Sequence, residues 1–155
     1  MGPELFLVFL AMAVMTTVID LVSRRVFGKS VHWAVREGLP RDVMLGQLVM
    51  SETPIRTRQP VALHGTPDQV FLNRKGCLVP IDTKLRGKAR ATHADRMQLS
   101  VYATILRHTR AEPVADYGYV RTVTPGHRVR YIKVWLLSER RVIAQQHTVQ
   151  SKEYA

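Results

Sequence analysis

The chain is poor in acidic residues and in cysteine. Its 155 residues contain 12 Asp and Glu against 23 Lys and Arg, which gives a formal net charge of +11 at pH 7. This excess favours a polyanionic partner, either nucleic acid or anionic lipid, and does not choose between them. The single cysteine, Cys77, excludes a disulfide framework, a four-cysteine zinc site and a cysteine-ligated iron–sulfur cluster within one chain. The length allows one domain with a substantial hydrophobic core.

One apolar run, close to the N-terminus, is about long enough to span a membrane. Residues 5–19 carry no charge, and the apolar character resumes after a lone Asp20. That is about the minimum length that spans a bilayer, and the basic residues that follow place the rest of the chain in the cytoplasm. We therefore predict a membrane-anchor helix in residues 1–25, which contacts the membrane through residues 5–22, followed by one domain in residues 26–155. A core helix of a soluble domain is the alternative.

The rest of the chain has the pattern of strands around one helix. Three β-rich runs are separated by "RQP" and by the hairpin-type signal "NRKG", which predicts an antiparallel meander. A helical period then begins with Thr92 as N-cap and Asp95 in the first turn, and two more strands surround the turn "TPGH". A polar amphipathic tail ends the chain. The expected strands are 48–57, 60–72, 77–86, 116–123 and 128–137, and the expected helix is 93–109.

Two carboxylates lie in otherwise apolar runs of the meander. Residues two apart in a strand face the same side, so Asp82 and Lys84 project together, and a turn at "NRKG" brings Asp68 alongside. Two neighbouring carboxylates raise one another's pKa unless a divalent cation lies between them, and such oxygen ligands suit Mg²⁺ or Mn²⁺. The alternative is that Asp68 caps a turn after Pro67, while Asp82 and Lys84 form an ordinary ion pair.

The order of these residues resembles the PD-(D/E)XK nuclease superfamily. Its pattern is a Pro-Asp on one strand, a variable hairpin, and an acidic-x-Lys on the next strand. Here Asp68 follows a proline, and Asp82 and Lys84 follow the hairpin. The resemblance implies that Asp68 and Asp82 bind Mg²⁺ or Mn²⁺ together with the backbone carbonyl of Thr83. It also implies that Lys84 orients the attacking water or stabilises charge on the scissile phosphate, as metal-assisted phosphodiester hydrolysis requires.

The resemblance narrows to the RecB-like branch, which includes the CRISPR-associated RecB-like exonucleases. Gln98 and Tyr102 form a Q-x-x-x-Y pair on one helical face, and by resemblance they steady the site or the nucleic acid strand. The segments "SE", "HGTPDQVF", "GCLVPIDTK", "HADRMQLSVYA" and "ADYGYVR" run in the same order as in membrane-anchored bacterial relatives of those exonucleases. The match covers residues 48–122. It implies an α/β (α+β) fold with a restriction-endonuclease-like core, in which helices flank a mixed central sheet and an apolar N-terminal helix precedes it.

Two further metal ligands are predicted with specific alternatives. Members of the family often have an earlier acidic residue, and Glu52 is the best placed candidate, with Glu37 weaker; the alternative for both is a surface or capping role. Some RecB-like members use a histidine before the first strand, which His32 could match, although packing beside Trp33 is the alternative. The iron–sulfur cysteines of many CRISPR-associated members are missing, so no cluster is expected.

Basic residues are plentiful on both sides of the predicted site. Two lie in the "NRKG" turn and three directly follow Lys84, where they could line a groove for a nucleic acid backbone. The alternative is that these basic residues belong to solvated loops. Three tyrosines on predicted strands could stack on bases, and packing within the protein is the alternative for them; they are Tyr117, Tyr119 and Tyr131. The predicted nucleic-acid-binding residues are Arg74, Lys75, Arg86, Lys88 and Arg90.

These observations lead to three hypotheses about function. The first is a metal-dependent DNA nuclease, exonuclease-like and tethered to the cytoplasmic face of a membrane. The second is a catalytically silent nuclease fold that serves as a membrane-anchored nucleic-acid-binding or assembly component. The third is that the basic excess serves anionic lipid. The choice between DNA and RNA is left open.

Overall fold

The computed structural model describes residues 37–153, together with the isolated positions Met15 and Val35. The chain divides into two compact units, and all the elements below belong to the unit that begins at Gly38. Apart from Met15, the predicted anchor in residues 1–25 lies outside the described residues, as does His32. No helix in the described part of the chain is long and apolar enough to cross a membrane.

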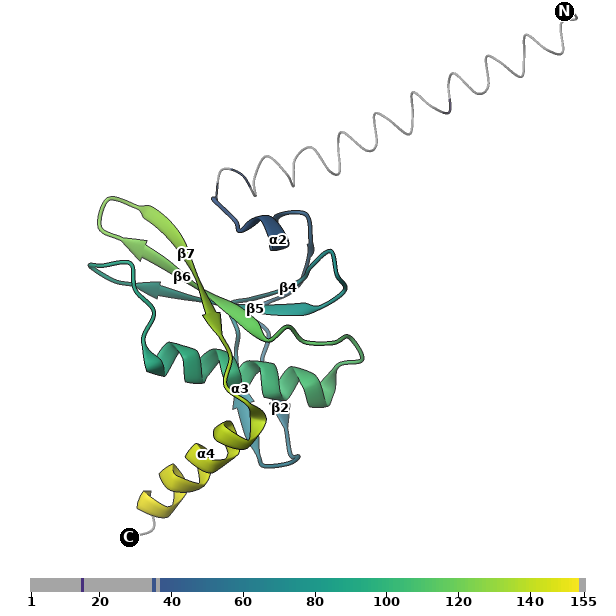
Figure 1. The fold of residues 1–155 in the computed structure, drawn as a ribbon, viewed down its shortest axis with the longest axis vertical. Coiled ribbons are helices and arrows are strands. Elements are labelled where there is room, and N and C mark those ends of the chain that lie inside the picture. The colour runs from purple at the N-terminus through teal and green to yellow at the C-terminus, as the bar shows by residue number, and fades with distance from the viewer. Residues whose placement is uncertain (1–14, 16–34, 36, 154–155) are drawn as a thin grey trace, which may run out of the picture. The chain divides into compact units, whose positions relative to one another are not determined.

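A mixed five-stranded sheet forms the centre of this unit, with strand order β1-β4-β5-β6-β7. Only β5 and β6 pair in parallel, because the long helix α3 connects them and allows the chain to return in the same direction. Figure 1 shows α3 along one face of the sheet and the short α2 at the opposite face. The α/β class with a mixed sheet flanked by helices is therefore confirmed. The elements are α2 (Arg41–Met44), β1 (Gln47–Ser51), β2 (Ile55–Thr57), β3 (Leu63–Gly65), β4 (Gln69–Leu72), β5 (Leu78–Leu85), α3 (His93–Thr109), β6 (Tyr117–Thr124), β7 (Arg128–Trp135) and α4 (Glu139–Glu153).

The predicted meander is interrupted in two places. Its first run divides into β1 and β2 at Glu52 and Pro54, and its second divides into β3 and β4 around Pro67. A proline has no N–H to donate to a strand partner, and Glu52 has a left-handed φ of 47°, so pairing stops at these positions. Within the sheet, β1, β4 and β5 form an antiparallel meander, while β2 and β3 form a separate two-stranded hairpin.

The turns and the helix start follow the predicted chemistry. The side chain of Asn73 accepts hydrogen bonds from the backbone of Lys75 and Cys77, which closes the "NRKG" turn. At the start of α3, Thr92 and Asp95 form a reciprocal capping box. The β6–β7 pairing brackets the turn at 125–127, as expected from "TPGH".

The hydrophobic core lies between α3 and the sheet. Leu99, Ile105 and Leu106 of α3 are fully buried and pack in one cluster with Leu78 of β5 and Val120 of β6. This packing holds α3 across β5, and so it determines which helix residues meet the end of that strand.

Candidate active site

Asp82 and Lys84 share the face of β5 that is turned toward α3. The Nζ of Lys84 lies 2.7 Å from Asp82 Oδ2 and donates to Gln98 Oε1 at 2.9 Å. Gln98 Nε2 donates to Asp82 Oδ1 at 3.1 Å, so the three side chains form a closed ring. The predicted same-face arrangement of Asp82 and Lys84 is confirmed. The packing of α3 against the sheet brings Gln98 next to both side chains.

Tyr102 lies one helical turn beyond Gln98 and completes this network. Gln98 Nε2 donates to the Tyr102 hydroxyl at 2.6 Å. Burial raises the pKa of Tyr102, so the hydroxyl remains neutral near pH 7. Gly65 lies against the ring, because a Cβ added at this glycine would lie 2.5 Å from Tyr102 Cε1. The absence of a side chain at residue 65 is therefore required for the observed position of the ring.

Asp68 reaches the same end of β5 from the residue before β4. Pairing of β4 with β5 begins at Gln69 and Ile81, so the backbone of Thr83 is left at an open edge of the strand. The Thr83 N–H donates there to Asp68 Oδ2. In a strand, the N–H and C=O of one residue point to the same neighbour, so the Thr83 carbonyl faces this edge as well. Two carboxylates and one backbone carbonyl therefore gather at the end of β5.

The Asp82 carboxyl is buried and incompletely paired. Its side chain is 4% exposed, and each carboxylate oxygen has one partner, Gln98 at Oδ1 and Lys84 at Oδ2, whereas a carboxylate can accept about four hydrogen bonds. Burial raises the pKa of Asp82 above its usual range despite the lowering effect of Lys84, and the negative charge of Asp68 raises the pKa further. A positive charge between the two carboxylates would reverse these effects.

These observations fit a divalent cation with few protein ligands. Within the described part of the chain, no group of three or more His, Cys, Asp or Glu side chains could hold a metal ion. A cation at Asp68 and Asp82 would therefore take two carboxylates, the Thr83 carbonyl and ligands from outside the protein. Mg²⁺ is commonly bound in this way, through one or two carboxylates, with water and substrate phosphate in the remaining positions.

Glu52 lies beside Asp68 through its backbone only. The Glu52 N–H donates to the Asp68 carbonyl at 3.0 Å, but the Glu52 side chain is exposed and does not form a three-carboxylate cluster with the two aspartates. The metal-binding role of Glu52 stays a prediction.

Arg86, which the sequence predicts to bind nucleic acid, makes contacts within the protein, and its role toward nucleic acid stays a prediction. Its guanidinium forms two hydrogen bonds of 2.7 Å with Asp95, and the same group donates to the Arg90 carbonyl. Burial by itself would raise the pKa of Asp95, but hydrogen bonds from Arg86 and Thr92 outweigh burial and hold that pKa below its usual range. Arg86 therefore anchors the start of α3.

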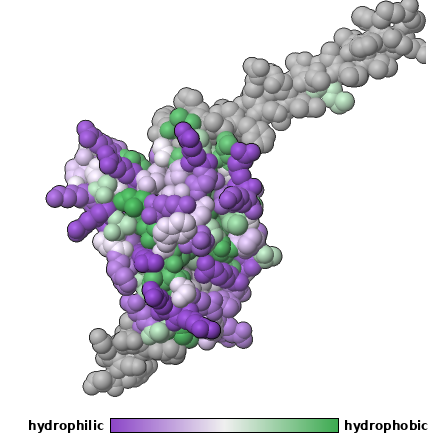
Figure 2. Space-filling model, in the orientation of Figure 1, coloured by the Kyte–Doolittle hydropathy of each residue, from purple (hydrophilic) through white to green (hydrophobic). Residues whose placement is uncertain are grey.

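Of the other predicted basic residues, two lie near the site and two do not. Lys88 and Arg90 are exposed and line an open hollow of about 550 Å³ beside the start of α3. Figure 2 shows hydrophilic side chains projecting at the end of the molecule where the β6–β7 turn lies. Arg74 and Lys75 lie in the β4–β5 turn, at the opposite end of β5 from Lys84. Their predicted place beside the site is therefore wrong.

The structure adds a cation that the sequence pattern does not reveal. Lys84 is opposite Thr122 of β6, and Thr122 is opposite Arg130 of β7, so Lys84 and Arg130 lie in one row on one face of the sheet. The turn at "TPGH" predicts the β6–β7 register, but the parallel pairing of β5 with β6 depends on the packing of α3. Arg130 is exposed.

The strand tyrosines lie on the other face of the sheet. Tyr117 contacts Tyr119 edge to face, Tyr119 contacts Tyr131 in the same way, and the Tyr119 hydroxyl donates to Asp42 of α2. Burial, with a further contribution from Asp42, raises the pKa of Tyr117 to about 12. These rings pack against one another and α2, away from Asp82.

Comparison with known proteins identifies no family. No family model matches the chain, and no curated protein matches it. A solved structure titled "Crystal structure of SSO0001" is similar over 93% of this chain, with 14% sequence identity and a TM-score of 0.45. The chain spans 61% of the length of that structure.

Proposed function

We propose that the protein is a metal-dependent nuclease that hydrolyses phosphodiester bonds of DNA in an exonuclease-like manner. The observation that carries the proposal is the incompletely paired Asp82 carboxyl, buried beside Asp68 and Lys84 at the end of β5. A purely structural ion pair does not need a second carboxylate that raises the pKa of the first. Perturbed carboxyls of this kind are typical of sites that bind a cation or transfer protons.

The residues of the site have distinct tasks in this reaction. Asp68, Asp82 and the Thr83 carbonyl would hold Mg²⁺ or Mn²⁺, which when bound lowers the pKa of a water ligand and neutralises phosphate oxygens. The Lys84 side chain is 28% exposed, so its ammonium can reach a phosphate and stabilise the negative charge that develops there. Gln98 holds Lys84 and Asp82 in position, and Tyr102 in turn holds the Gln98 amide.

The tether is a separate part of the proposal. The uncharged run in residues 5–19 and the basic residues that follow it support anchoring at the cytoplasmic face of a membrane. The nuclease reaction does not depend on it.

One observation favours a catalytically silent alternative. The ring of Asp82, Lys84 and Gln98 already gives the Lys84 ammonium two acceptors within the protein. A chain in which this ring never opens would bind nucleic acid or assemble with partners at the membrane without cleaving the backbone.

A cleavage assay separates the two functions. The full-length protein in non-ionic detergent is incubated with end-labelled linear DNA, circular DNA or RNA, in Mg²⁺, Mn²⁺ or EDTA. The Lys84→Ala variant tests the site, and Lys75→Ala is the matched control, since it removes the same charge at the far end of β5. We expect metal-dependent cleavage that Lys84→Ala abolishes and Lys75→Ala retains. Binding without cleavage by the wild-type protein would establish the silent alternative, and preference for linear DNA would show that ends are required.

A further inference from the structure

The β2–β3 hairpin is a basic arm beside the proposed site. It packs along α3 and extends past that helix (Figure 1). Between Glu52 and Asp68 the sequence contains no acidic residue, whereas Arg56, Arg58 and His64 are all present. An arm with this composition attracts polyanions.

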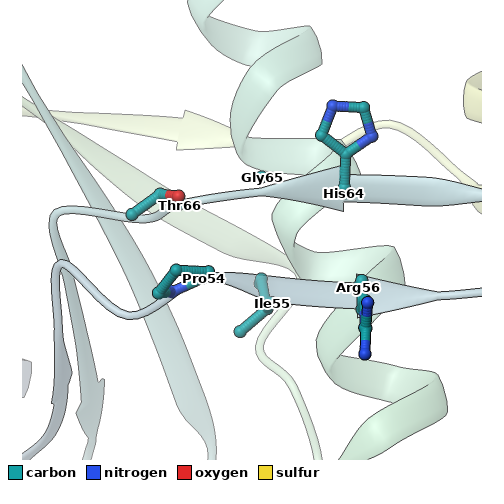
Figure 3. A pocket seen from close by; sticks show the side chains of 6 residues that line it. All are labelled: Pro54, Ile55, Arg56, His64, Gly65 and Thr66. Carbon is teal, nitrogen blue, oxygen red and sulfur yellow. The ribbon is translucent and has the colours of Figure 1, made fainter.

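A hollow lies at the open end of this hairpin. Its volume is about 470 Å³, and Figure 3 shows the strands that form it, with α3 behind them. Arg56 is directly opposite His64, so both side chains belong to the outer face of the hairpin and both are exposed. Ile55 and Leu63 are buried in the hairpin's contact with α3. The residues that line the hollow are Pro54, Ile55, Arg56, His64, Gly65 and Thr66.

The hollow connects to the proposed site through one aromatic ring. Gly65, which lines the hollow, lies against Tyr102, whose hydroxyl accepts from Gln98. Gln98 in turn donates to Asp82. Along the chain, Thr66 at the edge of the hollow is followed after one proline by Asp68. A nucleic acid strand with one phosphate at the two aspartates would therefore have the hairpin beside it.

We infer that this hollow binds a backbone phosphate of the nucleic acid strand, other than the phosphate that is cleaved, with Arg56 and His64 as the donors, one from each strand of the hairpin. The inference rests on the proposed function, because the nuclease reaction supplies the substrate strand. A guanidinium presents paired N–H donors that match phosphate oxygens, and an imidazole N–H adds a further donor. Arg56 and His64 are therefore positioning residues for the substrate and take no part in the bond-breaking step.

Arg58 supplies a matched control. It lies on the same exposed hairpin and carries the same charge as Arg56, but it does not line the hollow. The variants Arg56→Gln, His64→Gln and Arg58→Gln therefore separate a phosphate site from general charge. Because all three side chains are exposed, each variant is expected to fold.

The test measures binding without cleavage. A fluorescein-labelled single-stranded DNA oligonucleotide is titrated with full-length protein in detergent and EDTA, at several NaCl concentrations. We expect Arg56→Gln to weaken binding about tenfold at low salt and to reduce the slope of log K against log [NaCl] by about 0.7, the value of one phosphate contact on a single strand. We expect His64→Gln to weaken binding by a few-fold and Arg58→Gln by less than twofold. In the cleavage assay, Arg56→Gln should raise KM and leave kcat unchanged.

Several outcomes would overturn the inference. Equal losses in Arg56→Gln and Arg58→Gln would show diffuse charge in place of a site, and so would an unchanged salt slope in Arg56→Gln. A wild-type protein that does not bind the oligonucleotide would overturn it as well. Failure of the proposed nuclease reaction is distinguishable, because a protein that binds through Arg56 but does not cleave in Mg²⁺ retains the phosphate site. If the protein cleaves DNA but Arg56→Gln binds the oligonucleotide as tightly as the wild type, the proposed nuclease function stands and the phosphate site is excluded.

Discussion

Asp82 and Asp95 are two buried carboxylates, with side chains 4% and 2% exposed, that each pair with a cation at the end of β5. Their pKa values nevertheless move in opposite directions, upward for Asp82 and downward for Asp95. Burial raises the pKa of both, so the difference comes from the donors and charges around them.

The surroundings of Asp95 are complete. Arg86 donates two hydrogen bonds to the two carboxylate oxygens, and the Thr92 backbone and hydroxyl both donate to Oδ2. Asp82 receives one amide hydrogen bond and one ammonium that it shares with Gln98, and the charge of Asp68 opposes its ionisation. In this protein, the Asp95 carboxylate accepts four hydrogen bonds and anchors the start of α3, whereas the Asp82 carboxylate has only two donors around it and is the candidate binding site.

The largest expected effect is on cleavage. Asp82→Asn removes one of the two carboxylates proposed to hold the metal, and we expect cleavage to fall by about 10²–10³-fold. The assay is the release of end label from linear DNA in Mg²⁺. The control Asp116→Asn removes a carboxylate that is exposed and outside the site, and it should cleave as the wild type does. Equal activity of Asp82→Asn and wild type would remove Asp82 from the mechanism.

The second largest effect is on folding. Asp95→Asn breaks the Arg86 pair and the capping box together, so we expect the free energy of unfolding to fall by about 3 kcal/mol. In EDTA, Asp82→Asn should leave this free energy unchanged or raise it, because it relieves an ionised group that burial disfavours. Urea denaturation of the three proteins measures both. A loss in Asp82→Asn as large as that in Asp95→Asn would mean that the two pairs are equally structural.

Metal binding should stabilise the folded protein through Asp82 but not through Asp95. A ligand that binds only the folded protein raises the free energy of unfolding by about 1.4 kcal/mol at ten times its Kd. We expect Mg²⁺ to produce this increase in the wild type and in Asp95→Asn but not in Asp82→Asn, as measured by urea denaturation with and without Mg²⁺. The same increase in Asp82→Asn would place the cation elsewhere.

The smallest effect is on pH dependence in EDTA. Because the folded pKa of Asp95 is lowered, its stabilisation is complete above the unfolded value of about 3.9 and is lost as the pH falls through the folded pKa. For Asp82 the folded pKa is raised, so its favourable contribution is present below about pH 3.9 and is lost as the pH rises through the raised pKa. Urea denaturation of wild type, Asp82→Asn and Asp95→Asn across this range should give differences of opposite slope, and parallel slopes would contradict the assignment.

Local chemistry made a good part of the fold and site predictable. Strand alternation places Asp82 and Lys84 on one face, and the pairing of Thr92 with Asp95 marks the helix start. The asparagine and glycine of "NRKG" predict the hairpin between β4 and β5. Pro54 and Pro67 are visible in the sequence, but the β-rich pattern on both sides of each proline predicts a continuous strand, and the structure has a break there.

The sequence by itself determined which residues alternate, turn and cap, because those properties depend on neighbours within a few positions. Only the tertiary structure decided that Gln98 closes the ring around Lys84, that Arg86 pairs with Asp95, and that Gly65 of the β2–β3 hairpin lies against Tyr102. The physical reason is that these contacts depend on how α3 packs across β5 and against the β2–β3 hairpin. That packing comes from burial of apolar surface, which is not directional, so the sequence pattern shows which faces are apolar but not which of them meet.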